Sequence, residues 1–323
     1  MKDFNALDTD HAAPLPQTKL YHDVLQVMGR EVWQISLTYG KAQCIVRHAG
    51  PLGVVALLPK GPIWASSVTG AQRRQDIHGL WPQLKQMGVQ CLITNAASFE
   101  DAQIFKQIGH IPIISGQCEA RINLLLSPLR RRQQMQGKWR NRLARAEGEG
   151  LRLAHRPFDY VRDQWLLEAE LKQRKLRHYR SHPIAFSSVA AALDQDHTRL
   201  FLAFHKKTLI AAMLFLRHGA SATYFLGHSN DKGRSMSAHN LLLWEASNWL
   251  ASHGHRRLDL GIIDTETGAG LARFKLGSGA QAVPLGDTIL YTRPTAFVAS
   301  MLRKITPHRE ARAVGVQSDP SCH

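Results

Sequence analysis

The residues with the clearest potential for chemistry in this 323-residue chain lie in one stretch, 258–279. An alternating apolar run ends at Gly261, and the polar loop that follows carries Asp264 and Glu266. Carboxylates in such a loop can orient an attacking amine or accept its proton. The alternative is a solvated loop in which Glu266 caps the next helix. Both interpretations place the two carboxylates between a strand and a helix.

The helix after this loop carries the most informative single residue, Lys275. Leu271, Phe274 and Lys275 have the spacing i, i+3 and i+4, which places them together on a helix that Gly277 and Gly279 end. If Leu271 and Phe274 face inward, Lys275 lies at the edge of the buried face and is partly desolvated. A cation there can stabilise negative charge that develops in a reaction. The alternative is a salt bridge to the acidic loop or to a neighbouring domain.

The absence of several catalytic and cofactor-binding motifs narrows the range of reactions expected of the chain. It contains no GxSxG, Walker loop, HExxH or Rossmann GxGxxG sequence, no CxxC pair and no His-Cys cluster at ligand spacing. A covalent nucleophile, a metal and a bound cofactor are therefore not expected. The reaction class that fits is direct attack of a substrate amine on an activated acyl group, in which the protein aligns the reactants and stabilises an oxyanion.

Positive charge dominates the composition, with a formal net charge of +16. Such an excess attracts RNA, DNA, an anionic membrane surface or diphosphate-bearing substrates. In the run 130–145, Met135, Trp139 and Leu143 recur at helical spacing and predict one amphipathic basic helix. A second predicted helix, 160–177, ends in another basic patch. The candidate contacts for tRNA or another polyanion are Arg140, Arg142, Arg145, Lys172, Arg174, Lys175 and Arg177.

Four further residues are candidates for substrate binding. Lys60 lies in a turn and is a candidate contact for a substrate phosphate, with an exposed turn lysine as the alternative. Tyr224 belongs either to the site or to the core, and Phe274 lies beside the candidate lysine. Glu245 falls within the apolar stripe of a helix predicted over 238–252, so its carboxylate needs a partner. That partner is either a structural salt bridge or a group at the site.

The predicted elements have the same order in both halves of the chain. Short β-rich runs between residues 32 and 59 form a meander, and helix, glycine and strand follow it. The order recurs after residue 200, which indicates two related α/β units. The N-terminus lacks the basic-then-apolar order of a signal peptide, and no apolar run approaches the ~18 residues of a membrane span. A cytoplasmic protein without a transmembrane segment is therefore expected.

Six short segments between about residues 50 and 290 occur in an order typical of one family. The segments are Lys60-Gly61-Pro62, Trp139-Arg140-Asn141-Arg142-Leu143-Ala144-Arg145-Ala146 with Gly150-Leu151, Tyr224-Phe225-Leu226-Gly227-His228-Ser229, Leu241-Leu242-Leu243-Trp244-Glu245, Leu258-Asp259-Leu260-Gly261 and Leu271-Ala272-Arg273-Phe274-Lys275. Through them the chain resembles the Fem-type peptidyltransferases, which comprise FemA, FemB and FemX-like proteins.

The resemblance implies a mixed α/β fold of two tandem GNAT-like domains. It also implies transfer of an amino acid from aminoacyl-tRNA to an amine on a peptidoglycan precursor or another small acceptor, with Lys275 neutralising charge that develops on the aminoacyl ester. The organisation expected on this basis is a flexible tail over 1–18, an acceptor-side domain over 19–132, a donor-side domain over 133–293, and a C-terminal helix and tail over 294–323.

Three departures from the family pattern qualify what it implies. The chain has no segment for the long coiled-coil arm of some members, which indicates the compact, FemX-like form. Ser181-His182-Pro183 stands where members often carry His-Arg-Pro, so Arg180 is the candidate for the phosphate-binding arginine. Gly277-Ser278-Gly279 follows Lys275 in place of an aromatic residue, which leaves the acceptor open.

Two other functions stay open. CoA-dependent N-acyltransferases of the BioF2 or CelD type use the same double-GNAT architecture with acyl-CoA as donor. GNAT enzymes bind the CoA pyrophosphate on a glycine-rich loop, and segment 231–238 lacks its usual R/Q-x-x-G-x-G/A spacing. A non-catalytic RNA-binding protein would explain the charge but gives Lys275 and the acidic loop no role. An anionic membrane surface is a further candidate for peripheral contact.

Overall fold

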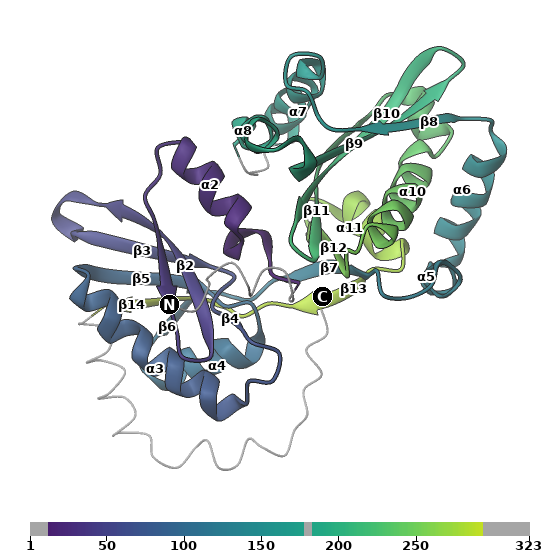
Figure 1. The fold of residues 1–323 in the computed structure, drawn as a ribbon. Helices are drawn as coiled ribbons and strands as arrows, with labels where there is room; N and C mark the ends of the chain where they lie inside the picture. Colours follow the sequence, from purple (N-terminus) through teal and green to yellow (C-terminus); the bar gives the residue numbers. More distant parts are fainter. Residues whose placement is uncertain (1–11, 178–182, 293–323) are drawn as a thin grey trace. The chain divides into compact units, whose positions relative to one another are not determined.

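The computed structural model describes residues 12–177 and 183–292 (Figure 1). These residues form two compact units. The first unit contains 29–118 and 283–292, and the second contains 12–28 and 119–282. Each unit has its own mixed seven-stranded sheet and its own core. None of the described helices combines the length and the apolar character that crossing a membrane requires.

The sheet of the first unit begins with an antiparallel meander of β1 (Val32–Ser36), β2 (Gly40–His48) and β3 (Val54–Pro59). β5 (Val89–Asn95) then pairs with β3 in parallel. Parallel neighbours need a crossover connection, and α3 (Gly70–Gln86) supplies it. The other elements of this unit are a 3-10 turn (Gly50–Leu52), β4 (Ile63–Trp64), α4 (Phe99–Gln107), β6 (Ile111–Ile114) and β14 (Thr288–Thr292).

The second unit repeats this order. β8 (Arg152–Arg156), β9 (Thr198–His205), β10 (Thr208–His218) and β11 (Ser221–Ser229) are antiparallel, and β12 (Arg257–Ile262) pairs with β11 in parallel. The other elements are α2 (Lys19–Val27), β7 (Cys118–Asn123), α5 (Pro128–Gln134), α6 (Gly137–Gly148), α7 (Gln164–Arg177), α8 (Ala185–Leu193), α9 (Asp231–Ser235), α10 (Ala238–Ser252), α11 (Ala269–Gly277), β13 (Gln281–Pro284), and 3-10 turns at Leu15–Gln17 and Gln195–His197.

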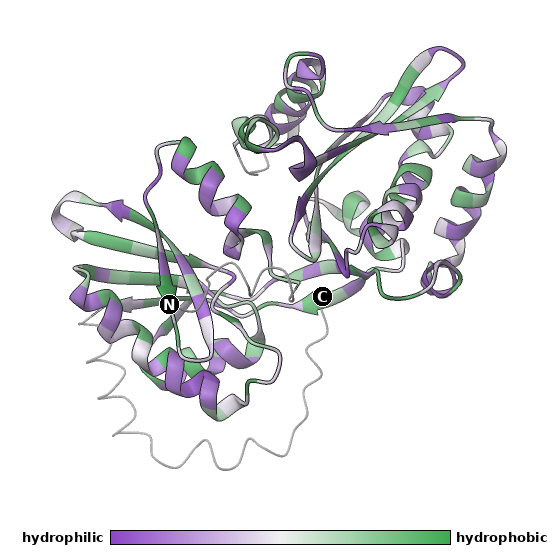
Figure 2. Cartoon of the chain, viewed as in Figure 1, coloured by the Kyte–Doolittle hydropathy of each residue, from purple (hydrophilic) through white to green (hydrophobic). Residues whose placement is uncertain are grey.

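Both faces of the second sheet are covered. On β10, Met213 and Phe215 join the core that contains α6 and α10, whereas Ala212 and Leu214 join the opposite core with residues of α7 and α8. A strand buried on both faces reads as a continuous apolar run, because neither face meets water. Figure 2 shows β10 as hydrophobic and α6 as largely hydrophilic, since α6 turns only one side inward.

The two units exchange one strand each. β7 follows β6 in the chain, yet it pairs with β12 in the second sheet. β14 follows β13, yet it lies between β5 and β6 in the first sheet. In both sheets the inserted strand occupies the same place, between the parallel strand and the strand after it.

The mixed α/β architecture is confirmed, and the described residues contain no coiled-coil arm. The division of the chain differs from the expected boundary at 132, because β7 pairs with β12 and carries residues 119–132 into the second unit. The described part of the expected tail, 12–18, includes Leu15 at 3 % exposure, and α2 belongs to the second unit. The predicted C-terminal helix and tail, 294–323, lie outside the described residues.

The prediction of a single basic helix over 130–145 was wrong, because the chain forms two helices, α5 and α6, with a break at Met135 and Gln136. Both residues have extended backbone angles there. The Gln136 N–H donates to the Gly277 carbonyl at 3.0 Å and not to a helical partner. A contact distant in sequence therefore replaces a local hydrogen bond.

Candidate functional site

The second sheet opens where β11 and β12 part. Their parallel pairing covers only Ser221–Thr223 against Arg257–Asp259. β11 then continues to Ser229 along β10, and β12 continues to Ile262 along β7. Tyr224 is the first residue of β11 beyond the shared pairs, and its hydroxyl covers the α-carbon of Gly227, where a Cβ would lie 2.5 Å from it. The Lys275 side chain contacts β12 beyond these shared pairs, at Ile262.

Lys275 lies at the end of β12 with only 6 % of its surface exposed. Its Nζ donates to the Ile262 carbonyl at 2.7 Å. Gly261 has φ of +82°, and a Cβ at this position would lie 3.6 Å from the Nζ. Glycine therefore allows the left-handed backbone, and a Cβ here would be in ordinary contact with the Nζ.

α11 holds Lys275 by packing tightly on α6. A Cβ on Gly277 would lie 2.8 Å from the Trp139 ring, so only glycine fits there without a shift. The Phe274 and Trp139 rings lie 6.0 Å apart, and the Ser278 hydroxyl donates to the Lys275 carbonyl at 2.6 Å. Trp139 of the basic segment and the Phe274-Lys275 pair, which are far apart in sequence, thus meet in one place.

The side of α11 that faces the core differs from the prediction. Leu271 was expected to face inward, but 46 % of its surface is exposed. The buried positions are Ala272, Lys275 and Gly277. Because Gly277 packs against Trp139, the helix turns the line of 272 and 275 inward, and the lysine is more deeply buried than an edge position would make it.

The acidic loop is ordered by Asp264. Its carboxylate accepts from the Glu266 N–H at 3.0 Å, the Thr267 N–H at 2.9 Å and the Thr267 hydroxyl. These hydrogen bonds, led by that of the Thr267 hydroxyl, lower the pKa of Asp264. A carboxylate with a lowered pKa is a weak base, so this geometry favours orientation or loop structure over proton transfer. Glu266 is exposed.

His239, which no sequence pattern singled out, lies near Phe274. The His239 ring centre is 6.3 Å from that of Phe274, and its Nε2 donates to the His228 carbonyl at 2.9 Å. Burial lowers the pKa of His239 and keeps it neutral at pH 7. Its position in the first turn of α10, beside buried Ala238, was the available signal, because a histidine inside an apolar stripe needs a polar partner.

Glu245 lies on the side of α10 that faces α6. Burial and the nearby Glu147 carboxylate raise its pKa. Glu147 itself accepts two hydrogen bonds from Arg132, at 2.7 and 2.6 Å. The half-buried Glu245 therefore faces another carboxylate, and protonation relieves that repulsion.

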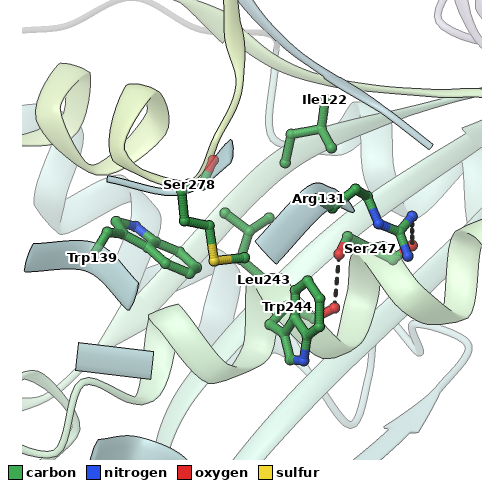
Figure 3. Close-up of a pocket in the computed structure, with 8 residues that line it drawn as sticks. Ile122, Arg131, Trp139, Leu243, Trp244, Ser247 and Ser278 are labelled. Carbon is green, nitrogen blue, oxygen red and sulfur yellow. Dashed lines mark hydrogen bonds between the residues drawn. The ribbon is translucent and has the colours of Figure 1, made fainter. Parts of the chain in front are cut away.

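A small pocket lies beside this helix pair (Figure 3). Arg131, 4 % exposed, donates to the Ser247 carbonyl at 3.3 Å and to Asn248 Oδ1 at 2.7 Å. Figure 3 shows its guanidinium directed along α10, with Trp139 on the far side of the pocket. The pocket is lined by Ile122, Arg131, Met135, Trp139, Leu243, Trp244, Ser247 and Ser278.

The candidate polyanion contacts lie mostly on the outer surface. On α6, Arg140, Arg142 and Arg145 are exposed, and Arg145 pairs with Glu149 at 3.1 Å. On α7, Lys172 and Lys175 are exposed, while Arg174 binds Glu170 at 2.9 Å. Arg180 and the side chain of Arg177 lie outside the described residues.

Lys60 belongs to the first unit and lies in the turn after β3. Its φ is +49°, and its backbone N–H donates to Asn95 Oδ1 at 2.9 Å. The peptide bond of the next two residues, Gly61-Pro62, is cis. The side chain of Lys60 is partly exposed.

Comparisons with known proteins give a domain match and a shared fold. Residues 129–276 match the family model of the acetyltransferase (GNAT) domain. The fold of the chain is similar to that of FemX, with a TM-score of 0.73 and 11 % identity, covering 94 % of this chain and 97 % of FemX. No curated protein matches the chain by sequence.

Two further structures have the same fold. One is the C-terminal domain of a putative lysylphosphatidylglycerol synthetase from Agrobacterium fabrum, with a TM-score of 0.54, 14 % identity, and coverage of 94 % of this chain and 97 % of that one. The other is a conserved protein of unknown function from Bacteroides thetaiotaomicron, with a TM-score of 0.59, 8 % identity, and coverage of 89 % and 94 %. The recognition of a Fem-like, double-GNAT fold and the prediction of a transferase enzyme are confirmed: the chain shares the fold of FemX, and residues 129–276 match the acetyltransferase (GNAT) domain.

Proposed function

We propose that this protein transfers an aminoacyl group from aminoacyl-tRNA to the amine of a small acceptor by direct aminolysis. The observation that carries the proposal is Lys275, a buried cation held at 2.7 Å from the Ile262 carbonyl at the opening of the second sheet. A preorganised cation in a desolvated position stabilises developing negative charge more strongly than one in water. The net charge of +16 suits a polyanionic donor.

In this reaction the acceptor amine attacks the ester carbonyl of the aminoacyl-tRNA, a C–N bond forms, and the carbonyl oxygen becomes an oxyanion. The ammonium of Lys275 stabilises that oxyanion. The ester C–O bond then breaks, and the proton lost by the attacking nitrogen passes to the leaving ribose oxygen, which becomes the terminal hydroxyl of the tRNA. Asp264 and Glu266 would orient the attacking amine, because the Asp264 carboxylate is ionised and weakly basic.

The same proposal assigns substrate contacts. Tyr224 and Phe274 would contact the aminoacyl group beside Lys275. Glu245, on α10, would also contact the substrate. Lys60 and Arg180 would contact phosphate on the acceptor, as the Fem-type resemblance implies for a peptidoglycan precursor. The cytoplasm is the compartment in which aminoacyl-tRNA is available.

The alternative is CoA-dependent N-acyl transfer, which the match to an acetyltransferase domain favours. The loop that would bind the CoA pyrophosphate argues against it. The Gly233 N–H donates to Asn230 Oδ1 at 2.9 Å, and the Arg234 N–H donates to the Asn230 carbonyl at 2.9 Å. The Met236 N–H is also bonded within the segment, to Lys232. Backbone donors already in use do not cradle a pyrophosphate.

The deciding experiment offers the pure protein both donors in parallel. Aminoacyl-tRNA labelled on the amino acid and acyl-CoA labelled on the acyl group are each incubated with a panel of amines and peptides. We expect label to move from the tRNA to an amine. Transfer from acyl-CoA alone would establish the alternative. Binding of tRNA without transfer from either donor would indicate a non-catalytic RNA-binding protein.

A further inference from the structure

The second unit carries a cluster of cations that none of the roles above uses, around the Trp249 ring. We call it the Trp249 cluster. The guanidinium carbons of Arg199 and Arg217 lie 4.5 and 5.2 Å from the Trp249 ring centre. The ring centres of His155 and His253 lie 5.5 and 3.8 Å from it. Guanidinium and imidazole groups stack on an indole face at these distances.

Three adjacent strands contribute to the cluster, since His155, Arg199 and Arg217 come from β8, β9 and β10. Their spacing of about 4.8 Å per strand gives a row of roughly 10 Å, longer than one phosphate group. Like charges on neighbouring strands repel each other. Among the described residues, the one carboxylate within 4 Å of either arginine is Asp196, which lies 3.7 Å from Arg217 and is itself 80 % exposed.

The hydrogen bonds of the cluster fix the orientation of its two guanidinium groups. Arg199 donates to His155 Nδ1 from Nε at 3.0 Å and also from one terminal nitrogen at 2.7 Å. A neutral His155 then carries its proton on Nε2. Arg217 donates to His255 Nε2 at 3.1 Å and to the Asp196 carbonyl at 2.9 Å. The cluster therefore presents N–H donors and positive charge.

Part of the repulsion is offset by α10. Trp249 lies in its last turn, and the C-terminal carbonyls of a helix carry about half a negative charge. Two guanidinium groups exceed that charge. Burial and the neighbouring Arg217 lower the pKa of Arg199, which is the direction expected for a cation that lacks a full counter-charge. His155 and His253 are exposed, and Arg199 is partly exposed, so the cluster is accessible in this unit.

We propose that the Trp249 cluster binds the phosphate backbone of RNA, as a docking surface for the tRNA donor. The inference rests on the proposed function for the identity of the RNA. Rigid arginine forks favour directional contacts to phosphate oxygens, whereas attraction to an anionic membrane depends on net charge near the surface and needs no fixed geometry. Stacking on Trp249 and the bond to His155 hold the Arg199 fork in one orientation.

The test measures tRNA binding by the full chain at several KCl concentrations. Arg199→Ala and Arg217→Ala should each reduce the slope of log Kobs against log[KCl] by about 1, the change for one lost phosphate contact. Arg199→Lys should keep most of the slope. The matched control is Arg152→Ala. Arg152 lies on β8 and, like the cluster arginines, stacks on an aromatic ring, Phe204 at 4.1 Å, but Phe204 packs in the opposite core.

A second measurement uses the unaltered protein, so it holds even if the variants fold poorly. Phenylglyoxal labels accessible arginines, and peptide mass spectrometry should show that tRNA protects Arg199 and leaves Arg152 reactive. Equal protection of both, or unchanged slopes in both cluster variants, would overturn the proposal. Binding of anionic phospholipid vesicles that requires Arg199, with tRNA binding unaffected, would also overturn it and assign the surface to a membrane.

The tRNA-binding test of the Trp249 cluster and the label-transfer test of the proposed function can fail independently. If tRNA binding depends on Arg199 but no label moves from aminoacyl-tRNA, the cluster stands and the transfer reaction fails. If label moves and binding is independent of both arginines, the reaction stands and the cluster has another role.

Discussion

Burying a charged side chain costs free energy unless polar groups compensate it. Lys275 is 6 % exposed and is also the candidate catalytic residue. Replacing it should remove one oxyanion stabiliser. Lys275→Ala is expected to lower kcat for aminoacyl transfer by on the order of 10²-fold or more. Lys275→Met keeps the chain length without the charge and should show the same loss, whereas Lys207→Ala, at an exposed turn, should be neutral.

The measurement is single-turnover transfer from labelled aminoacyl-tRNA, with thermal unfolding of each variant recorded beside it. Near-normal turnover in a folded Lys275→Met variant would remove the ammonium from the mechanism.

His110 predicts how the first unit responds to acid. It lies between Phe105 and Tyr291, is 3 % exposed, and neither ring nitrogen has a hydrogen-bond partner among the described residues. Burial lowers its pKa to about 3. The unfolded chain takes up this proton near pH 6.5, so stability should fall as the pH drops below 6.5, by about 1.4 kcal/mol per pH unit until the folded pKa is reached.

The test compares urea unfolding at pH 7 and pH 5 for the natural protein, His110→Phe and His78→Gln, the last being an exposed histidine of the same unit. His110→Phe should flatten the dependence, and His78→Gln should preserve it. An equal slope in all three proteins would show that His110 does not govern it.

At the residue level, spacing was enough to select Lys275, but not its surroundings. Periodicity placed it at the edge of a buried face, and the backbone of Gly261 and the packing of Gly277 on Trp139 bury it further. Leu271 was misjudged for the same reason, since a nine-residue helix has too few apolar positions to define its inner side. His239 was missed because its partner, the His228 carbonyl, comes from a different element.

Among the elements, α11 contains two glycines that should respond to substitution in opposite directions. A Cβ on Gly277 would lie 2.8 Å from Trp139, whereas a Cβ on Gly270 meets no atom within 4 Å. Gly277→Ala should therefore destabilise the protein by about 1–3 kcal/mol through overpacking. Gly270→Ala in the same helix should stabilise it by roughly 0.5–1 kcal/mol, because alanine lowers the entropic cost of helix formation.

Both values follow from chemical unfolding monitored by circular dichroism. A Gly277→Ala variant as stable as the natural protein would mean that α11 can move away from α6 without cost.

The elements themselves were largely predictable, because strand alternation and helical spacing are local. The strand, loop and short helix of 258–279 are β12, the Asp264 loop and α11. The break between α5 and α6 was not predictable, since the N–H of Gln136 is satisfied by Gly277, far away in the chain.

For the whole molecule, the exchanged strands give a prediction that sequence order alone would not. Ile289 of β14 is fully buried in the core of the first unit. Ile289→Ala should cost about 2–5 kcal/mol, and hydrogen exchange should accelerate in peptides that contain Leu92, a residue of the same core. Peptides of β10 should keep their protection. The control Ile113→Ala removes a side chain that is 48 % exposed and should change exchange little.

Loss of protection confined to β10 would contradict the assignment of β14 to the first sheet. The repeated order of elements indicated two units, but no local pattern reports which sheet a four- to six-residue strand joins. β7 and β14 read as ordinary strands, and their partners are set by long-range pairing.

The place of β14 has a consequence for the chain while it is being made. β5 and β6 leave the ribosome early, yet the strand that lies between them is almost the last described segment to be synthesised. Until it arrives, the nascent first sheet holds an unfilled slot with two open strand edges, a template for unwanted pairing. Completion of the first sheet therefore waits for translation of β14, almost 200 residues after β5.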